Sequence, residues 1–139
     1  MFTQWRERSL KTESVVFVYL DAIALRVRIA NKVVSAPVLV GLGVKADGEK
    51  VVLDLELLQS ESSECWGGFV EGLANRGLRR PSLVIIDGNK GLRASVAKNW
   101  VGIEVQRCTV HKLRNLERHT PRHALEQVKT DYHAIVNAK

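Results

Sequence analysis

Two aspartates each follow directly on a short apolar run, and both are candidate metal ligands. Asp21 comes after Val15–Leu20, and Asp87 comes after Leu83–Ile86. Ligands of open α/β sheets bind at strand ends. If these two strands are neighbours, the carboxylates converge, and their mutual repulsion would raise the pKa of one of them. A divalent cation removes that repulsion, and Mg²⁺ accepts one or two carboxylates together with phosphate oxygens.

The chemistry that such a pair supports is attack on phosphodiesters. Two metal ions about 3.5–4 Å apart promote in-line displacement at phosphorus. A structural role is the alternative, because an aspartate at a strand end often caps a turn and Asp87-Gly88 has turn-like composition. The residues alone leave both interpretations open.

Cys108 and His111 lie three residues apart and form the second constellation. They could supply half of a zinc site, but a closed site needs four ligands and no second pair is evident, with Cys65 the only distant candidate. His111 could instead donate or accept a hydrogen bond at the active site from the start of a helix. The structural alternative is a buried cysteine beside a surface histidine.

A basic segment surrounds these two residues. Its cations are Arg107, Lys112, Arg114 and Arg118. Those at positions 114 and 118 share helical spacing with His111 and could follow a phosphate backbone, although a solvated helix face is the alternative. No aromatic residues alternate with them, so stacking on single strands is not indicated. The Gly88–Gly91 turn lacks the pattern of a phosphate-binding loop.

The net charge of +6 resides entirely at one end of the chain. Residues 1–89 hold 11 basic and 11 acidic side chains, whereas residues 90–139 hold 10 basic and 4 acidic ones. All four histidines also lie in the second part. A one-sided basic segment favours a polyanionic partner, because each neutralised phosphate releases counterions.

Strands and turns that could position the two aspartates dominate the first half of the chain. The apolar, β-rich segments are residues 15–20, 24–29, 33–44 and 51–58. We expect the first to be a buried strand that ends near Asp21 and the second to have one wet face. Turns are predicted at Asn31-Lys32 and Asp47-Gly48, which leaves three strands in antiparallel succession. Pro37 favours an edge position or a bulge.

Alternating helices and strands are predicted in the second half. A helix begins at Ser60 or Ser62 as N-cap and ends at Gly77. The following predicted elements are strand 81–87, helix 92–100, strand 101–105, a basic helix from Cys108 to a break at Pro121, and helix 125–138. The order βββαβαβα predicts an α/β fold with a mixed sheet and helices on its faces. Residues 1–14 are polar and are interpreted as a linker or remnant, with residues 15–139 as the folded core.

Composition excludes several classes of protein. The 139 residues are 45% hydrophobic and 26% charged, which is ordinary for a globular domain and excludes a disordered or coiled-coil chain. No apolar run approaches the roughly 20 residues that cross a bilayer, and the charged N-terminus does not resemble a signal peptide. Two cysteines form no disulfide framework. We therefore expect a soluble protein of the cytoplasm, without a membrane partner.

The ordered set of motifs resembles the catalytic core of bacterial Mutator-type insertion-sequence transposases. The motifs that carry the resemblance, from about Val15 to Leu116, are YLDA at 19–22, LGV at 42–44 with DG at 47–48, RGL at 76–78, VIIDG at 84–88, GL at 91–92 and QRCTVHKLRNL at 106–116. Each motif is weak by itself, whereas their order and spacing are specific.

The resemblance implies a ribonuclease-H-like mixed sheet, in which three antiparallel strands precede βαβα units and the first and fourth strands are neighbours. It implies that Asp21 and Asp87 are the first two catalytic acids and metal ligands of a DDE enzyme that uses Mg²⁺. Cys108 and His111 match the family's C-x-x-H signature, and His111 is included in the catalytic set. The implied partners are double-stranded DNA, as transposon ends and target, in a nucleoid-associated bacterial protein.

The sequence also departs from the family pattern. The third acid, a glutamate, normally lies beyond a long helical insertion, and Glu117 and Glu126 come too early to match it. The chain is therefore expected to be a truncated core, incomplete at its C-terminus and inactive by itself. The alternative is a non-catalytic module that binds DNA or associates with a full-length transposase. A missing helical layer would leave apolar surface exposed and favour self-association.

Overall fold

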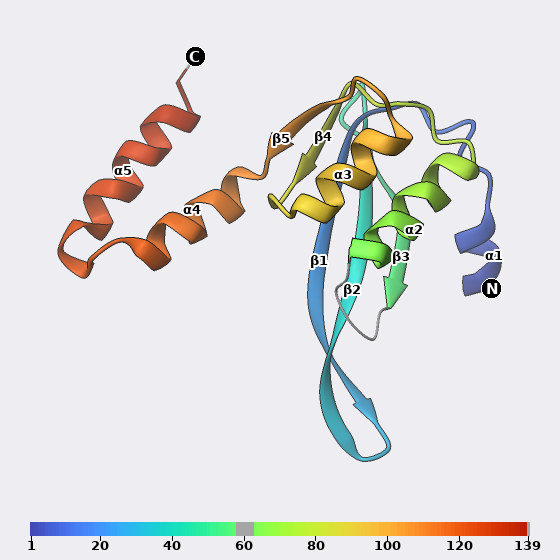
Figure 1. The fold of residues 1–139 in the computed structure, drawn as a ribbon, viewed down its shortest axis with the longest axis horizontal. Helices are drawn as coiled ribbons and strands as arrows, with labels where there is room; N and C mark the ends of the chain where they lie inside the picture. The colour runs from blue at the N-terminus through green and yellow to red at the C-terminus, as the bar shows by residue number, and fades with distance from the viewer. Residues whose placement is uncertain (58–62, 139) are drawn as a thin grey trace. The chain divides into compact units, whose positions relative to one another are not determined.

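An α/β fold is built around one five-stranded mixed sheet (Figure 1). The computed structural model describes residues 1–57 and 63–138. The elements are α1 (Phe2–Glu7), β1 (Val15–Ile29), β2 (Lys32–Lys45), β3 (Lys50–Leu57), α2 (Ser63–Asn75), β4 (Leu83–Ile86), α3 (Lys90–Asn99), β5 (Glu104–Arg107), α4 (Thr109–His119), the 3₁₀ turn Arg122–Ala124 and α5 (Leu125–Val136). The spatial order of strands is β3-β2-β1-β4-β5. The predicted α/β class with a mixed sheet is confirmed.

Both kinds of strand pairing meet at β1. It is antiparallel to β2, which is in turn antiparallel to β3, whereas β1 and β4 are parallel. The parallel register pairs Phe17 with Leu83 and ends with Leu20 opposite Ile86. Since parallel strands require a crossover, the chain reaches β4 through α2.

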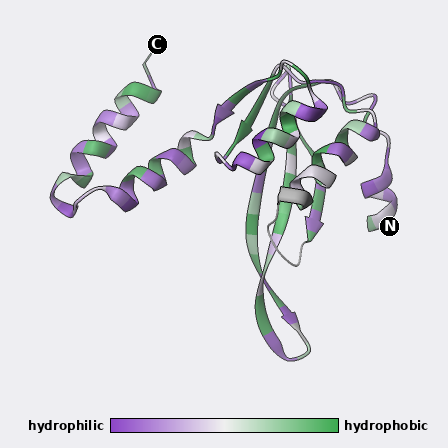
Figure 2. Ribbon diagram, in the orientation of Figure 1, coloured by the Kyte–Doolittle hydropathy of each residue, from purple (hydrophilic) through white to green (hydrophobic). Residues whose placement is uncertain are grey.

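The core lies between the sheet and helices α2 and α3. Its strand residues are Val18, Leu20, Leu39, Leu53, Val84 and Ile86, and its helix residues are Trp66, Phe69, Val70, Leu73, Leu92 and Val96. Trp66 and Phe69 meet edge to face, with ring centroids 5.9 Å apart. Figure 2 shows the strands at the centre of this layer as mainly hydrophobic. The apolar faces of the two helices therefore pack against the alternate strand residues that point to the same side of the sheet.

The opposite face of the sheet retains exposed apolar side chains. Phe17 and Tyr19 on β1 are 39% and 41% exposed, and Val52 on β3 is 39% exposed. Tyr19 pairs with Leu42, which pairs with Val52, so these residues share one face across three strands.

The first strand is longer than the sequence predicted. The strand expected to end near Asp21 continues through it, and the two predicted strands 15–20 and 24–29 are one, because β2 pairs with β1 from Val15 to Ile29. The reversal falls at Ala30 and Asn31, one residue before the predicted Asn31-Lys32 turn. Both have positive φ, 44° and 66°, as a two-residue hairpin turn of type I′ requires.

Local stop and turn signals are confirmed elsewhere. Gly77 has φ +91°, and it donates to Ala74 O at 2.9 Å while Leu78 donates to Leu73 O at 3.1 Å. This is the Schellman arrangement at the end of α2. Gly48 turns the chain between β2 and β3 with φ +88°. The predicted caps at Ser60 and Ser62 lie outside the described residues.

The N-terminal segment differs from the polar linker that the sequence predicted. Residues 2–7 form helix α1, and Leu10 is fully buried. Arg6 Nε lies 2.9 Å from Asp54 Oδ1, and Arg76 Nη2 lies 2.8 Å from Asp54 Oδ2. Arg76 also donates to the Arg6 carbonyl. Arg6 of this segment is therefore paired with Asp54 of β3 and hydrogen-bonded to Arg76 after α2. A count of polar residues does not reveal these contacts.

The Asp54 carboxylate is the centre of this cluster, and the Asp54 side chain is only 7% exposed. Its hydrogen bond raises the pKa of the Arg6 guanidinium. Burial lowers the pKa of Arg76, and the charge of Asp54 opposes that shift. Both guanidinium groups stay charged. The cluster fastens α1 to β3 and to the end of α2.

Contacts divide the chain into two units, Met1–Gln106 and Arg107–Lys139. This boundary differs from the predicted division at residue 14. In the second unit, α4 and α5 pack together, and Tyr132 donates to Thr109 O at 2.7 Å. Lys129 Nζ lies 3.5 Å from Glu117 across the same pair of helices. Within the described ranges, no helix has the length and apolar character needed to span a membrane.

Candidate active site

The two candidate aspartates occupy neighbouring backbone positions, Asp21 within β1 and Asp87 directly after β4. Leu20 and Ile86 are paired in the parallel register of β1 and β4, and Asp21 and Asp87 are the next residues of each strand path. Both aspartates have intermediate exposure. The structure thus brings together at the backbone two residues that are far apart in the sequence.

Asp21 is held within a strand rather than at a strand end. Its backbone pairs with Val40 of β2, and its Oδ1 accepts a hydrogen bond from Ala22 N at 2.8 Å. The residues on both sides of Asp21 also pair with β2, so the ladder holds the backbone of Asp21 and thereby fixes the position of its Cβ atom.

Asp87 begins the turn from β4 into α3. Its Oδ1 accepts from Asn89 N at 2.9 Å, which forms an Asx turn, and Gly88 has φ +103°. Asn89 then caps α3, since its side chain accepts from Leu92 N at 3.0 Å. The turn role that the sequence left as an alternative is therefore present, and it uses one carboxylate oxygen of Asp87.

Asn89 was missed as a cap by the sequence analysis, which assigned it only to a turn. Its signal is an asparagine three residues before Leu92, the first buried residue of α3. Its role is to start the helix at a fixed point after Asp87.

The donor set at this edge of the sheet consists of two carboxylates. Among the described residues, no group of three or more His, Cys, Asp or Glu side chains could hold a metal ion. Two carboxylates still suit Mg²⁺, which keeps several waters and commonly takes one or two protein carboxylates.

Cys108 and His111 lie in the second unit, at the start of α4. Cys108 is the N-cap residue, its carbonyl accepts from Lys112 N at 3.0 Å, and its side chain makes no capping bond. Cys108 and His111 are partly buried. One turn of helix thus places the two side chains of the C-x-x-H motif on adjacent positions of the same helix face.

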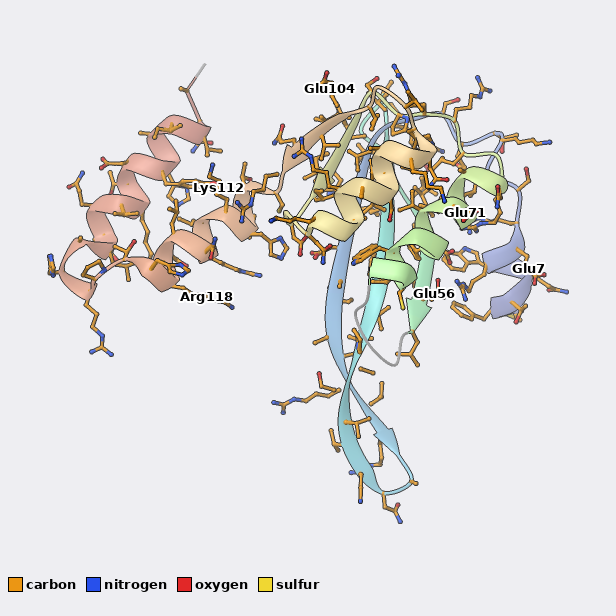
Figure 3. All side chains as sticks on the ribbon, in the orientation of Figure 1. Glu7, Glu56, Glu71, Glu104, Lys112 and Arg118 are labelled. Atoms are coloured by element: carbon orange, nitrogen blue, oxygen red, sulfur yellow. The ribbon has the colours of Figure 1, made fainter. Side chains whose placement is uncertain are left out.

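The basic residues of this segment are exposed. Arg107 ends β5, and Lys112, Arg114 and Arg118 belong to α4. Figure 3 labels Lys112 and Arg118 on that helix. None of these four cations forms an ion pair with a described residue, so their charge is available to a polyanion.

Comparison with known proteins gives a consistent result. Residues 1–139 match the family described as "Transposase, Mutator family". The chain is 34% identical over 116 residues to the transposase for insertion sequence element IS256 in transposon Tn4001 of Staphylococcus aureus, covering 84% of this chain and 30% of that protein. It is 39% identical over 116 residues to the transposase for ISRM5 of Rhizobium meliloti, covering 84% and 29% respectively.

A third relative is matched over a longer stretch. The transposase for IS1081 of Mycobacterium tuberculosis is 33% identical over 131 residues, which is 94% of this chain and 32% of that protein. The chain therefore spans about a third of the length of these relatives.

Proposed function

Because the chain belongs to the Mutator family of transposases, we propose that it is a segment of the catalytic core of an insertion-element transposase, an enzyme that cleaves DNA and transfers strands. The observation that supports the proposal is the parallel pairing of Leu20 with Ile86, because Asp21 and Asp87 are the next residues along these two neighbouring chain segments. The strand order β3-β2-β1-β4-β5, with three antiparallel strands first, supports a ribonuclease-H-like core.

Asp21 and Asp87 would hold Mg²⁺ in this proposal. The fit rests on the chemistry of the donor set, since carboxylate oxygens are hard ligands of the kind that Mg²⁺ prefers. The ion would supply Lewis-acid polarisation of a phosphodiester oxygen and charge stabilisation. The chain itself supplies position: pairing to β2 restrains Asp21, and the Asx turn and the Asn89 cap restrain Asp87.

Double-stranded DNA is the proposed partner of the basic segment. Arg107, Lys112, Arg114 and Arg118 would contact phosphates, which fixes the position of a duplex without reading its sequence. The C-x-x-H pair at the start of α4 would position that helix and contribute a hydrogen bond from His111. We propose that His111 acts within its own unit as a positioning residue for α4 rather than as a metal ligand.

A second candidate is a non-catalytic module that binds DNA or joins a longer transposase. The observation that favours it is the set of exposed cations in the basic segment, which can bind DNA whether or not a metal site forms. Exposed Phe17, Tyr19 and Val52 on the open sheet face support self-association in either case.

Metal binding tests the first candidate. We expect calorimetric titration with Mg²⁺ or Mn²⁺ to give binding to the wild-type chain, and none to Asp21→Asn or Asp87→Asn. Asp47→Asn is the matched control, because Asp47 Oδ1 accepts from Glu49 N at 2.9 Å in an Asx turn like that of Asp87. Equal binding by Asp87→Asn and Asp47→Asn would contradict the proposed site.

Nicking of supercoiled plasmid in the presence of the metal separates the two candidates. Metal-dependent nicking that Asp87→Asn abolishes supports a catalytic segment. Salt-dependent DNA binding without nicking favours the non-catalytic module. A DNA affinity that does not change with salt concentration contradicts both, because phosphate contacts release counterions.

A further inference from the structure

The distal part of the β1–β2 hairpin extends beyond the rest of the sheet (Figure 1). Pairing of β1 with β4 stops at Leu20, and the described pairing of β2 with β3 starts at Val38. Residues 24–37, which we call the hairpin extension, pair only with each other, from Ala24 opposite Pro37 to Ile29 opposite Lys32. Isolated two-stranded ribbons are marginally stable in water, so a ribbon of this kind benefits from a partner.

The charge of the hairpin extension has a single sign. Arg26, Arg28 and Lys32 are exposed, and no aspartate or glutamate occurs between Asp21 and Asp47. None of the three cations forms an ion pair with a described residue. By contrast, Lys45 at the other end of β2 lies within 3.5 Å of Glu13 and 2.8 Å of Glu49.

The arrangement of the cations suits the surface of a duplex. Arg26 and Arg28 are two residues apart on one strand, so both project from the same face of the ribbon. Their cross-strand partners, Ser35 and Val33, are small or apolar and add no negative charge. Lys32 pairs with Ile29 beside the turn at Ala30 and Asn31, so it lies at the far end of the ribbon and belongs to the face opposite the two arginines. Figure 3 shows side chains projecting outward from the hairpin on both sides.

The dimensions also fit. Six paired positions at about 3.4 Å per residue make a ribbon about 17 Å long, with strands about 4.8 Å apart. The major groove of B-DNA is about 12 Å wide and admits a two-stranded β-ribbon. The type I′ turn is tight and lacks a long loop, so the tip does not prevent entry.

We propose that the hairpin extension is a DNA-contacting arm, in which Arg26, Arg28 and Lys32 bind phosphates of double-stranded DNA along a groove. The arm rests on the proposed function, since DNA is the partner inferred for that function, and it adds a contact surface separate from the basic segment at α4. Val33, which pairs with Arg28 and is 60% exposed, shares the face of the two arginines and would then lie against sugar and base edges.

Salt-dependent binding to a 30-base-pair duplex of arbitrary sequence tests the arm. The variant carries Arg26→Gln, Arg28→Gln and Lys32→Gln. Each lost phosphate contact lowers the slope of log affinity against log salt by about 0.9 and, at 0.1 M salt, the affinity by about eight-fold. We therefore expect the slope to fall by about 2.7 if all three cations bind phosphates.

A matched control removes the same charge from other exposed positions, through Lys50→Gln, Arg79→Gln and Lys98→Gln. We expect this control to retain most of the slope, because charges farther than about 10 Å from DNA are screened at 0.1 M salt. Equal losses in the two triple variants would overturn the arm, since net charge alone would explain both. An unchanged melting temperature confirms that each variant is folded.

Further measurements distinguish failure of the proposed DNA-contacting arm from failure of the proposed function. If Arg114→Gln with Arg118→Gln weakens binding and the hairpin variant does not, the arm is wrong and the DNA partner stands. If the wild-type chain has no salt-dependent affinity for the duplex, both are wrong. Light scattering is measured in parallel, and dissociation of an oligomer in the hairpin variant would show that a second copy covers the ribbon, which also overturns the arm.

Discussion

Removing the Asp54 carboxylate should strongly destabilise the first unit. Asp54→Ala leaves Arg76, whose side chain is 14% exposed, without its carboxylate partner. Loss of one partner of a buried ion pair costs about 3–5 kcal/mol. The lower end applies here because Arg6 keeps Glu56 at 3.2 Å and Arg76 keeps the carbonyls of Gly72 and Arg6.

A cost of about 3 kcal/mol corresponds to a fall in melting temperature of roughly 12 °C for a unit of this size. Asp54→Asn keeps an acceptor oxygen but loses the charge, so we expect a smaller cost of about 1–2 kcal/mol. Fluorescence of Trp66 and Trp100, which are 3% and 4% exposed, reports unfolding of the core during urea titration.

Two further variants make this prediction specific. Glu71→Ala removes an exposed carboxylate from α2 and should change the free energy of unfolding by no more than about 0.5 kcal/mol. Combining Asp54→Ala with Arg76→Met should cost at least about 1 kcal/mol less than the two single variants together, since the pair is coupled. A cost for Asp54→Ala as small as that for Glu71→Ala would refute the clamp between α1, β3 and α2.

Two other predictions concern backbone conformation and pH. Gly77→Ala should lower the free energy of unfolding by about 1–2 kcal/mol, because φ is +91° at this position. Gly68→Ala within α2 should raise it by about 0.5–1 kcal/mol, because an added Cβ meets nothing within 4 Å. The urea midpoints of the two variants should therefore shift in opposite directions. The hydrogen bond to Glu49, followed by the charges nearby, raises the pKa of Lys45 above 10.5. The contribution of this ion pair to stability is complete below pH 10.5 and is lost as the pH rises through the higher pKa of the folded state. The difference in urea midpoint between wild type and Lys45→Gln should therefore shrink over that pH range. A difference that grows would contradict the prediction.

The candidate site could be predicted in part from the sequence. The apolar runs before Asp21 and Asp87 identified both residues, and the charge count located the basic segment. Those runs could not show that Leu20 pairs with Ile86. Strand order and register depend on the free energy of pairing across the whole sheet. The position of Asp21 inside β1 was missed for the same reason: the β2 strand continues the ladder where the β1 sequence becomes more polar.

By itself, the sequence determined features that depend on a few consecutive residues. Gly77 ends α2, Gly48 turns β2 into β3, and the basic helix begins at Cys108, because backbone conformation and capping act over one turn of chain. Only the tertiary structure decided that Arg6 and Arg76 meet at Asp54 and that a hairpin extends beyond the sheet. The ion pairs join Asp54 to residues 48 and 22 positions away, and their free energy comes from burial and charge pairing that exist only once the chain has folded. The hairpin pairs residues that are close in sequence, but its extension depends on where β4 and β3 stop pairing with it.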